Sequence, residues 1–189
     1  MPAPRSNPPL SLTEAQDRFI AAWGQMGSTW GISRTMAEVH ALLYISGRPL
    51  CTDDVMDRLA ISRGNASMSL RALVDWGIVE REHKRGDRKE YFRAEQDVWT
   101  LVRAILRERM KREIHPVMAS LAEMRDDAAK IDTPPESLSE HTDRLDALLT
   151  LLRMFDELSE KFLDLPIDQL RETAGVLSQA MKGPGGGPA

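Results

Sequence analysis

The stretch from Thr52 to Ala94 constrains the fold more than any other part of the chain. A short helical pattern begins at Thr52, and a second begins at Ser62 after a short break. Both residues are favoured at helix N-caps, because their side chains accept hydrogen bonds from N–H groups of the first turn. The second pattern ends at Gly77, where a left-handed cap is favoured. Its apolar face, at helical spacing, consists of Ala66, Leu70, Leu73 and Val74. The stretch therefore predicts two helices joined by a tight turn.

Two strand-forming runs, IVEREHK and KEYFRA, follow this helix pair. Val79, Tyr91 and Phe92 favour strands. The RGDR segment between the runs favours a turn, because Gly86 can supply the backbone geometry. The runs predict a β-hairpin with a basic tip. Two helices joined by a tight turn and followed by a hairpin form a winged helix-turn-helix, which is the fold predicted here.

The outward face of the second helix carries short polar groups and two arginines, with no carboxylate before Asp75. In a helix-turn-helix, the second helix enters the DNA major groove with its N-terminal residues near base edges. Arginine can bind guanine through two hydrogen bonds, and asparagine can bind adenine. A serine at a helix N-terminus suits a phosphate. On this helix the predicted DNA-binding residues are Ser62, Arg63, Gly64, Asn65, Ser67, Met68 and Arg71.

Positive charge is concentrated at the predicted hairpin, although the formal net charge of the chain is −4. Between Arg81 and Arg93, six Lys or Arg stand against three Asp or Glu. Between Asp132 and Glu172, eleven acidic residues stand against four basic ones. Cations at a hairpin tip can neutralise DNA phosphates and release counterions. The predicted contacts at the tip are Lys84, Arg85, Gly86, Arg88 and Lys89. We expect Asp87 to hold an arginine of the tip in position.

The segment ISRGNASMSLRALVDWGIVEREHKRGDRKEYFRAEQDVW resembles the DNA-binding core of the GbsR-type branch of the MarR-superfamily regulators. The strings GNASMSLRAL, WGIV and KRGDRKEYF carry the resemblance, which covers residues 15–121. It implies a homodimeric bacterial transcriptional regulator, a repressor that binds double-stranded DNA at a near-palindromic operator. It also implies a response to a small effector, such as a quaternary ammonium osmoprotectant or its precursor.

The remaining sequence is mostly helical in pattern. One predicted helix begins after Asp97 and is kinked or interrupted at Pro116, and another covers residues 137–163. Both carry long apolar stripes that a small winged domain cannot bury by itself. Homodimerisation would cover them, and packing of the two helices within one chain is the alternative.

The predicted fold class is mainly α with a small β-hairpin wing: a winged helix-turn-helix plus a helical dimerisation region. Its predicted parts are a flexible arm at 1–11, the DNA-binding domain at 12–96, the dimerisation region at 97–182 and a disordered tail at 183–189. The first helix of the DNA-binding domain can also contribute to the dimer interface.

Aromatic residues on several of these segments form a candidate effector site. Aromatic faces attract quaternary ammonium cations. The candidates are Phe19, Trp23, Trp30, Tyr44 and Trp99. The alternative is ordinary packing of these rings in a core or an interface.

The composition favours a cytoplasmic protein with no catalytic residue, metal or cofactor. The single cysteine, Cys51, rules out an intramolecular disulfide, and no apolar run is long enough to span a membrane. The four histidines lack paired ligand spacing, and no nucleotide-binding loop is present. Two alternatives to a DNA-binding regulator stay open. One is a winged-helix module that binds proteins. The other is an enzyme that uses the carboxylates of Asp143, Asp146, Glu157 and Glu160.

Overall fold

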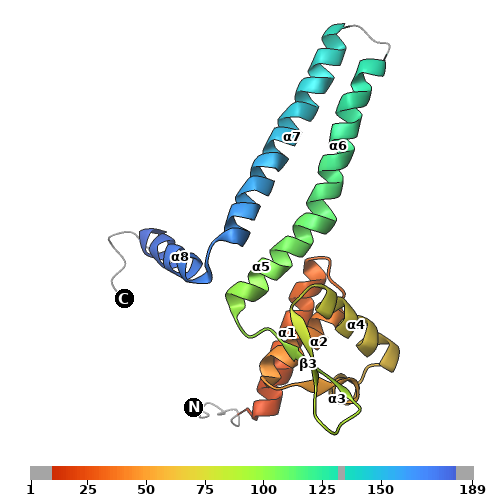
Figure 1. Cartoon of the computed structure of the whole chain (residues 1–189), viewed down its shortest axis with the longest axis vertical. Coiled ribbons are helices and arrows are strands. Elements are labelled where there is room, and N and C mark those ends of the chain that lie inside the picture. Colours follow the sequence, from red (N-terminus) through yellow and green to blue (C-terminus); the bar gives the residue numbers. More distant parts are fainter. Residues whose placement is uncertain (1–9, 132–134, 182–189) are drawn as a thin grey trace, which may run out of the picture. The chain divides into compact units, whose positions relative to one another are not determined.

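The computed structural model describes residues 10–131 and 135–181. Its backbone divides between Gln96 and Asp97 into two compact units. In Figure 1 the first runs from red to yellow-green and the second from green to blue. Of the predicted arm at 1–11, only Leu10 and Ser11 belong to the described residues, and the predicted tail at 183–189 lies outside them.

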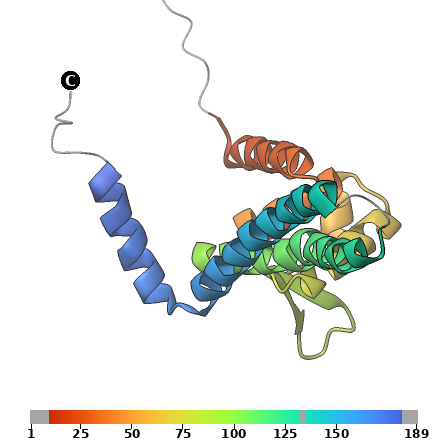
Figure 2. The same ribbon diagram turned by 90° about the horizontal axis from the view of Figure 1, so that it is seen from above.

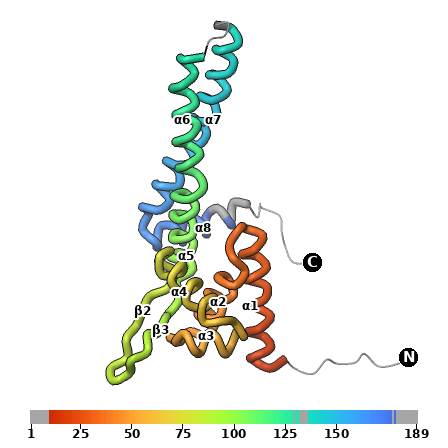
Figure 3. Tube along the Cα trace, turned by 90° about the vertical axis from the view of Figure 1, so that its right-hand side faces the viewer, coloured from red at the N-terminus to blue at the C-terminus, as the bar shows by residue number. Residues whose placement is uncertain are grey.

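The first unit combines four helices with a small sheet. Helix α1 (Leu12–Thr29) packs against α2 (Arg34–Ser46), and α3 (Thr52–Leu59) and α4 (Arg63–Asp75) form the predicted helix pair. Strands β1 (Leu50–Cys51), β2 (Val79–His83) and β3 (Glu90–Ala94) form an antiparallel sheet in the order β1-β3-β2. The hairpin β2–β3, called the wing here, projects from this unit (Figure 3). The predicted fold class, mainly helical with a small β wing, is confirmed.

The core of the first unit fixes the second helix of the pair. Its largest fully buried side chains come from α2, α3, α4 and β2, and they are Val39, Leu43, Val55, Leu70, Leu73 and Val79. Fully burying one such side chain contributes about 1.5–3 kcal/mol. Since Leu70 and Leu73 lie on one face of α4, their burial leaves the opposite face in solvent.

The start of α3 differs from the prediction in one respect. Cys51, and not Thr52, occupies the N-cap, so Thr52 is already the first helical residue. The carboxylate of Asp54 accepts a hydrogen bond from the backbone N–H of Cys51 at 2.8 Å. The prediction was wrong because an acidic residue in the first turn can fold back to the cap N–H, which leaves the cap position free for a buried thiol.

Two glycines let α1 approach α2 closely. A methyl group at Gly27 would lie 2.5 Å from the Cβ of Ala37, whereas one at Gly24 would lie 2.6 Å from the Cγ of Glu38, in a flexible side chain. We expect Gly27→Ala to lower the free energy of unfolding by about 1–3 kcal/mol, because helix backbones must separate. Gly24→Ala should change it by less than about 1 kcal/mol, because Glu38 can move and alanine favours the helix. Urea denaturation of both variants measures the difference, and equal losses would contradict it.

The second unit consists of helices and short connections in its described residues. Helix α5 (Val98–Arg109) leads through a π-helical turn (Met110–Ile114) into α6 (His115–Asp127), and a 3-10 turn (Ala128–Lys130) follows. Pro116 lies in the first turn of α6. Its ring lacks an N–H and collides with the carbonyl four residues earlier in a regular α-helix. The wider π turn accommodates that ring. The interruption predicted at Pro116 is therefore this π turn.

Helices α6 and α7 (Pro135–Asp164) run side by side, and α8 (Ile167–Met181) turns away from them (Figure 2). Leu145 and Leu149 of α7 are buried. Two polar contacts join the pair at its exposed edge: Arg125 with Asp146 and His115 with Asp156, both at 2.9 Å. Part of the apolar surface of α7 is therefore covered within one chain, which is the alternative to dimerisation that the sequence left open.

Candidate nucleic-acid interface

The turn between α3 and α4 sets the position at which α4 begins. Ala60 ends α3 in the left-handed conformation, with φ of 52°. Ser62 then caps α4, and its Oγ accepts a hydrogen bond from the backbone N–H of Asn65 at 3.2 Å. The first free N–H groups of α4 consequently point out of the helix end, where they can bind an anion.

The outward face of α4 carries most of the predicted DNA-binding residues. Ala66, Ser69, Leu70 and Leu73 are buried, and Val74 is only half-buried. Ser67 is half-buried as well, and the residues exposed on this helix and its cap include Ser62, Arg63, Gly64, Asn65, Met68 and Arg71. Arg71 donates from Nε to the carbonyl oxygen of Ser67 at 3.2 Å, which directs its guanidinium toward the start of α4. The helix presents base-reading groups and cations on one side.

The tip of the wing, residues 84–89, is an ordered turn built around Asp87. Its carboxylate accepts hydrogen bonds from the backbone N–H of Lys89 at 2.9 Å and from the hydroxyl of Tyr91 at 2.7 Å. These bonds lower the pKa of Asp87, the one from the Lys89 backbone most. No arginine side chain is among these partners, and the only arginine contact in the described residues is a weaker one from the backbone N–H of Arg88, which also lowers the pKa of Asp87. A short aspartate side chain bonds more readily to backbone N–H groups two residues ahead than to the guanidinium of a long arginine side chain.

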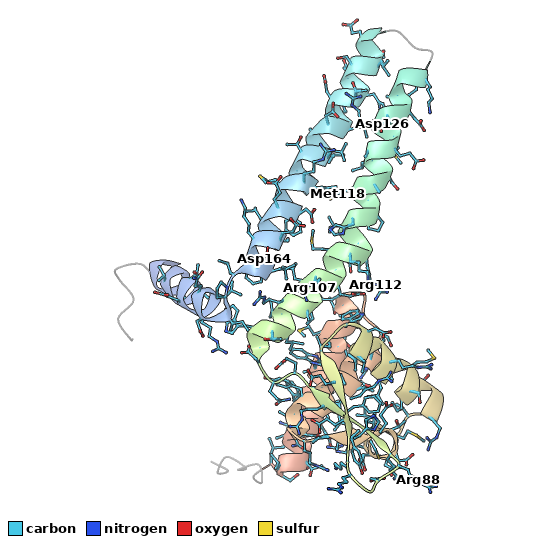
Figure 4. The ribbon with its side chains drawn as sticks, viewed as in Figure 1. Arg88, Arg107, Arg112, Met118, Asp126 and Asp164 are labelled. Atoms are coloured by element: carbon cyan, nitrogen blue, oxygen red, sulfur yellow. The ribbon has the colours of Figure 1, made fainter. Side chains whose placement is uncertain are left out.

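The cations of the wing tip differ in their surroundings. The Lys84 ammonium lies over the ring of Tyr91, 3.7 Å from its centroid. Arg85 and Arg88 are exposed and form no ion pair with any residue in 10–131 or 135–181. Arg88 lies at the end of the wing in Figure 4. Gly86 has φ of +85°, the left-handed geometry expected for this turn. Two guanidiniums are thus available to an anionic partner.

Arg63 and Lys89 are held by a carboxylate that sequence reasoning missed. Asp53, near the start of α3, contacts the Arg63 guanidinium at 2.5 Å and the Lys89 ammonium at 3.1 Å. The hydrogen bond from Lys89 lowers the pKa of Asp53 most, followed by that from Arg63. No local sequence pattern predicts this contact, because the three residues come from α3, α4 and the wing tip. Asp53 also lies in the first turn of α3, where a carboxylate suits the positive end of the helix dipole.

The structure brings three of the five aromatic candidates together. Phe19 lies 5.6 Å from Trp23 and 6.3 Å from Tyr44, measured between ring centroids. These are distances of rings in direct contact. Trp30 is the C-cap of α1 and about half exposed (52%), and Trp99 lies on α5 in the second unit. A cavity of ≈ 440 Å³ in the first unit is lined by none of the five; its walls include Gln16, Ser46, Arg48, Asp57 and Arg58.

His40 belongs to the same aromatic cluster, although its sequence position gave it no role. Its ring lies 6.0 Å from Trp23 and 6.1 Å from Tyr44, and the residue is 3% exposed. No residue among those described hydrogen-bonds its Nε2. Burial lowers the pKa of His40 to about 4. The imidazole is therefore neutral at pH 7, and it packs as an aromatic ring.

Neither a metal-binding cluster nor a membrane-spanning helix occurs among the residues that the structure describes. Across residues 10–131 and 135–181, no three His, Cys, Asp or Glu side chains gather in a way that would hold a metal ion. Over the same residues, no helix is both long and apolar enough to cross a bilayer. Cys51 is buried as a free thiol.

A helix pair, a polar recognition face and a basic wing define a winged helix-turn-helix domain. Residues 30–90 match the MarR family, which covers the elements from the end of α1 to the start of β3. This segment is therefore similar to the winged helix of the MarR family.

Relatives in Bacillus subtilis (strain 168) agree with this class. The chain is 26% identical over 92 residues to the putative HTH-type transcriptional regulator YvaV, covering 48% of this chain and 52% of that protein. It is 23% identical over 88 residues to the HTH-type transcriptional repressor OpcR, covering 47% and 48%. The chain thus spans about half the length of the curated relatives it matches. A crystal structure of a transcriptional regulator shares the fold, with 24% identity, a TM-score of 0.57 and coverage of 79% of this chain and 95% of that one.

Proposed function

We propose that the protein is a sequence-specific, DNA-binding transcriptional regulator that acts as a repressor. One observation carries the proposal: the exposed face of α4 combines Asn65, Met68 and Arg71 with no acidic side chain before Asp75 at the end of the helix, beside a wing tip whose two arginines form no ion pair in the described residues. An interaction module would expose apolar or acidic residues at this face. The relatives OpcR and YvaV are described as a repressor and a putative regulator of the helix-turn-helix type.

Each group on this surface has a distinct part in the proposed complex. Arg71 and Asn65 read base edges in the major groove, where arginine pairs with guanine and asparagine with adenine. Met68, 62% exposed, offers an apolar contact for a thymine methyl group. Ser62 and the α4 N-terminus bind a phosphate, and Arg85 and Arg88 bind the neighbouring backbone.

The protein is proposed to act as a homodimer. On α7, Leu148, Leu151, Phe155 and Leu158 are 46–57% exposed and recur at intervals of three and four residues. This set, called the outer stripe of α7, has the spacing of a coiled-coil seam. It is separate from the buried pair Leu145 and Leu149. Two copies joined by a two-fold axis would present two α4 helices to half-sites roughly 34 Å apart, on a near-palindromic operator.

The protein is further proposed to belong to the GbsR-type branch. It would act in the bacterial cytoplasm and respond to a small quaternary ammonium effector. The strings GNASMSLRAL and KRGDRKEYF support the branch. The half-buried ring of Trp23, in the cluster with Phe19 and Tyr44, offers an aromatic face to such a cation.

Fluorescence anisotropy tests the proposal, using the duplex upstream of the protein's own gene and a scrambled duplex at several salt concentrations. We expect tighter binding to the upstream duplex, weakening as salt rises. Arg71→Ala should lose about 10- to 100-fold in affinity for that duplex, because one good base contact supplies ~1–3 kcal/mol of discrimination.

Arg144→Ala is the matched control, since Arg144 is an exposed arginine of α7 that pairs only with Glu140 in the described residues. It should bind as the unaltered protein does. Equal, weak binding of both duplexes would contradict the proposal and favour a protein-binding module. Choline and betaine added to the preformed complex then test the effector: release of DNA supports it, and its absence argues against this ligand class.

A further inference from the structure

Asp53 lies where three parts of the proposed DNA surface meet. It belongs to α3, whereas its two partners belong to the start of α4 (Arg63) and to the wing tip (Lys89). One carboxylate oxygen contacts Arg63 at 2.5 Å and the other contacts Lys89 at 3.1 Å. The side chains are well exposed, at 41% for Asp53, 67% for Arg63 and 54% for Lys89. The group is therefore open to a ligand.

The charges of this group do not suit a purely structural role. Exposed ion pairs contribute little to folding stability, because water screens them and long side chains lose freedom when paired. The Lys89 and Arg63 hydrogen bonds keep the pKa of Asp53 low, so its carboxylate is ionised at neutral pH. The three groups together then carry a charge of about +1, whereas the two cations alone would carry about +2.

A carboxylate that accepts from two cations offers them the same chemistry as a DNA phosphate, namely two anionic oxygens at hydrogen-bond distance. We propose that Asp53 is an intramolecular phosphate mimic. In the free protein it occupies Arg63 and Lys89, and these cations exchange Asp53 for backbone phosphates only when α4 and the wing are both seated on an operator. This inference rests on the proposed DNA-binding function, and it assigns Asp53 as a residue that restrains DNA binding without contacting DNA.

The consequence is weaker binding to DNA, including binding to non-operator DNA. Binding of that kind depends almost entirely on phosphate neutralisation, with a slope of about −0.9 in log affinity against log salt for each phosphate. Operator binding must break the Asp53 contacts and so loses at least as much affinity, but its base contacts keep the operator complex the tighter of the two. At about 0.1 M salt, one more neutralised phosphate corresponds to ~8-fold in affinity.

Asp53→Asn tests the inference, because it removes the charge while keeping the shape of the side chain. Asp57→Asn is the matched control: it removes the same charge from the exposed residue one turn further along α3, which contacts neither Arg63 nor Lys89. Both full-length variants are titrated with operator and scrambled duplexes at several salt concentrations. Thermal unfolding, measured in parallel, identifies any variant that fails to fold, and Asp53→Ala then serves as the second substitution.

We expect Asp53→Asn to bind scrambled DNA about 8-fold more tightly at about 0.1 M salt, with a slope steeper by about one. Its affinity for the operator should rise by at least the same factor, and Asp57→Asn should resemble the unaltered protein. Unchanged or weaker binding of scrambled DNA by Asp53→Asn would overturn the inference, and so would an equal gain in Asp57→Asn. If the unaltered protein shows no operator preference, the proposed function fails and this inference fails with it. If the unaltered protein does prefer the operator, the Asp53 variants alone test the inference about Asp53.

Discussion

Leu151→Glu is expected to convert the protein from a dimer to a monomer. Leu151 is 55% exposed in the single chain and lies within the outer stripe of α7. If this stripe is the dimer seam, a two-fold axis places the substitution in the interface twice. Each copy then loses about 1.5–3 kcal/mol of apolar burial and brings an unpaired carboxylate into a dry contact. We expect the dimer dissociation constant to rise by at least about 100-fold.

Thr150→Glu is the matched control for this prediction. Thr150 is the neighbouring residue on the same helix, is exposed, and lies about 100° around the helix from Leu151. The Thr150→Glu substitution adds the same charge outside the stripe and should leave the dimer intact. Light scattering after size-exclusion chromatography measures both masses. A monomeric unaltered protein, or a Leu151→Glu variant that stays dimeric, would show that this stripe is not the seam.

The second large effect expected is a loss of stability as the pH falls from 7.5 to 5, caused by His40. The pKa of this histidine is about 4 in the folded chain, against an ordinary value of 6.5. Between these values the unfolded chain binds more protons than the folded one, so stability increases with pH in this window. The full difference corresponds to about 3 kcal/mol, of which about 2 kcal/mol is lost between pH 7.5 and pH 5.

Urea denaturation at several pH values measures this loss, and His40→Phe isolates it because phenylalanine keeps a ring among Trp23 and Tyr44. The variant should lack the extra loss between pH 6.5 and pH 4, whatever its stability at pH 7. His40→Gln gives a second comparison if phenylalanine is too large. Asp53 and Asp87, whose pKa values are lowered from 3.8, contribute stability that is lost below about pH 4, outside this window. Parallel pH profiles for the unaltered protein and both variants would refute the role of His40.

Local patterns were sufficient to predict the winged helix. The Ser62 cap, the apolar spacing of Leu70 and Leu73 and the left-handed Gly77 each depend on residues within one or two helical turns. Because burial of one face of α4 determines which side chains stay outside, the exposed set on that helix followed from the same pattern. The same helical spacing of apolar residues therefore predicted both the core of the domain and the exposed surface of α4.

The contacts among the cations could not be predicted in the same way. Asp53 meets Lys89 across 36 positions of sequence, and which oxygen finds which cation depends on how the wing lies against α3. Asp87 was assigned to an arginine because opposite charges are adjacent in the sequence, but the turn directs its carboxylate to Tyr91 instead. His40 had no neighbouring signal, because its lowered pKa arises from burial between two helices.

In the proposed complex, the network of Asp87, Tyr91 and Lys84 would also affect how tightly the wing holds DNA. A flexible basic loop loses conformational entropy when it settles on a phosphate backbone, and this loss opposes binding. At this wing tip the loss has already occurred on folding, since Asp87 fixes the backbone of Lys89 and the Tyr91 ring supports Lys84. Arg85 and Arg88 are therefore carried on a pre-organised turn, and more of their attraction to phosphate remains as net affinity.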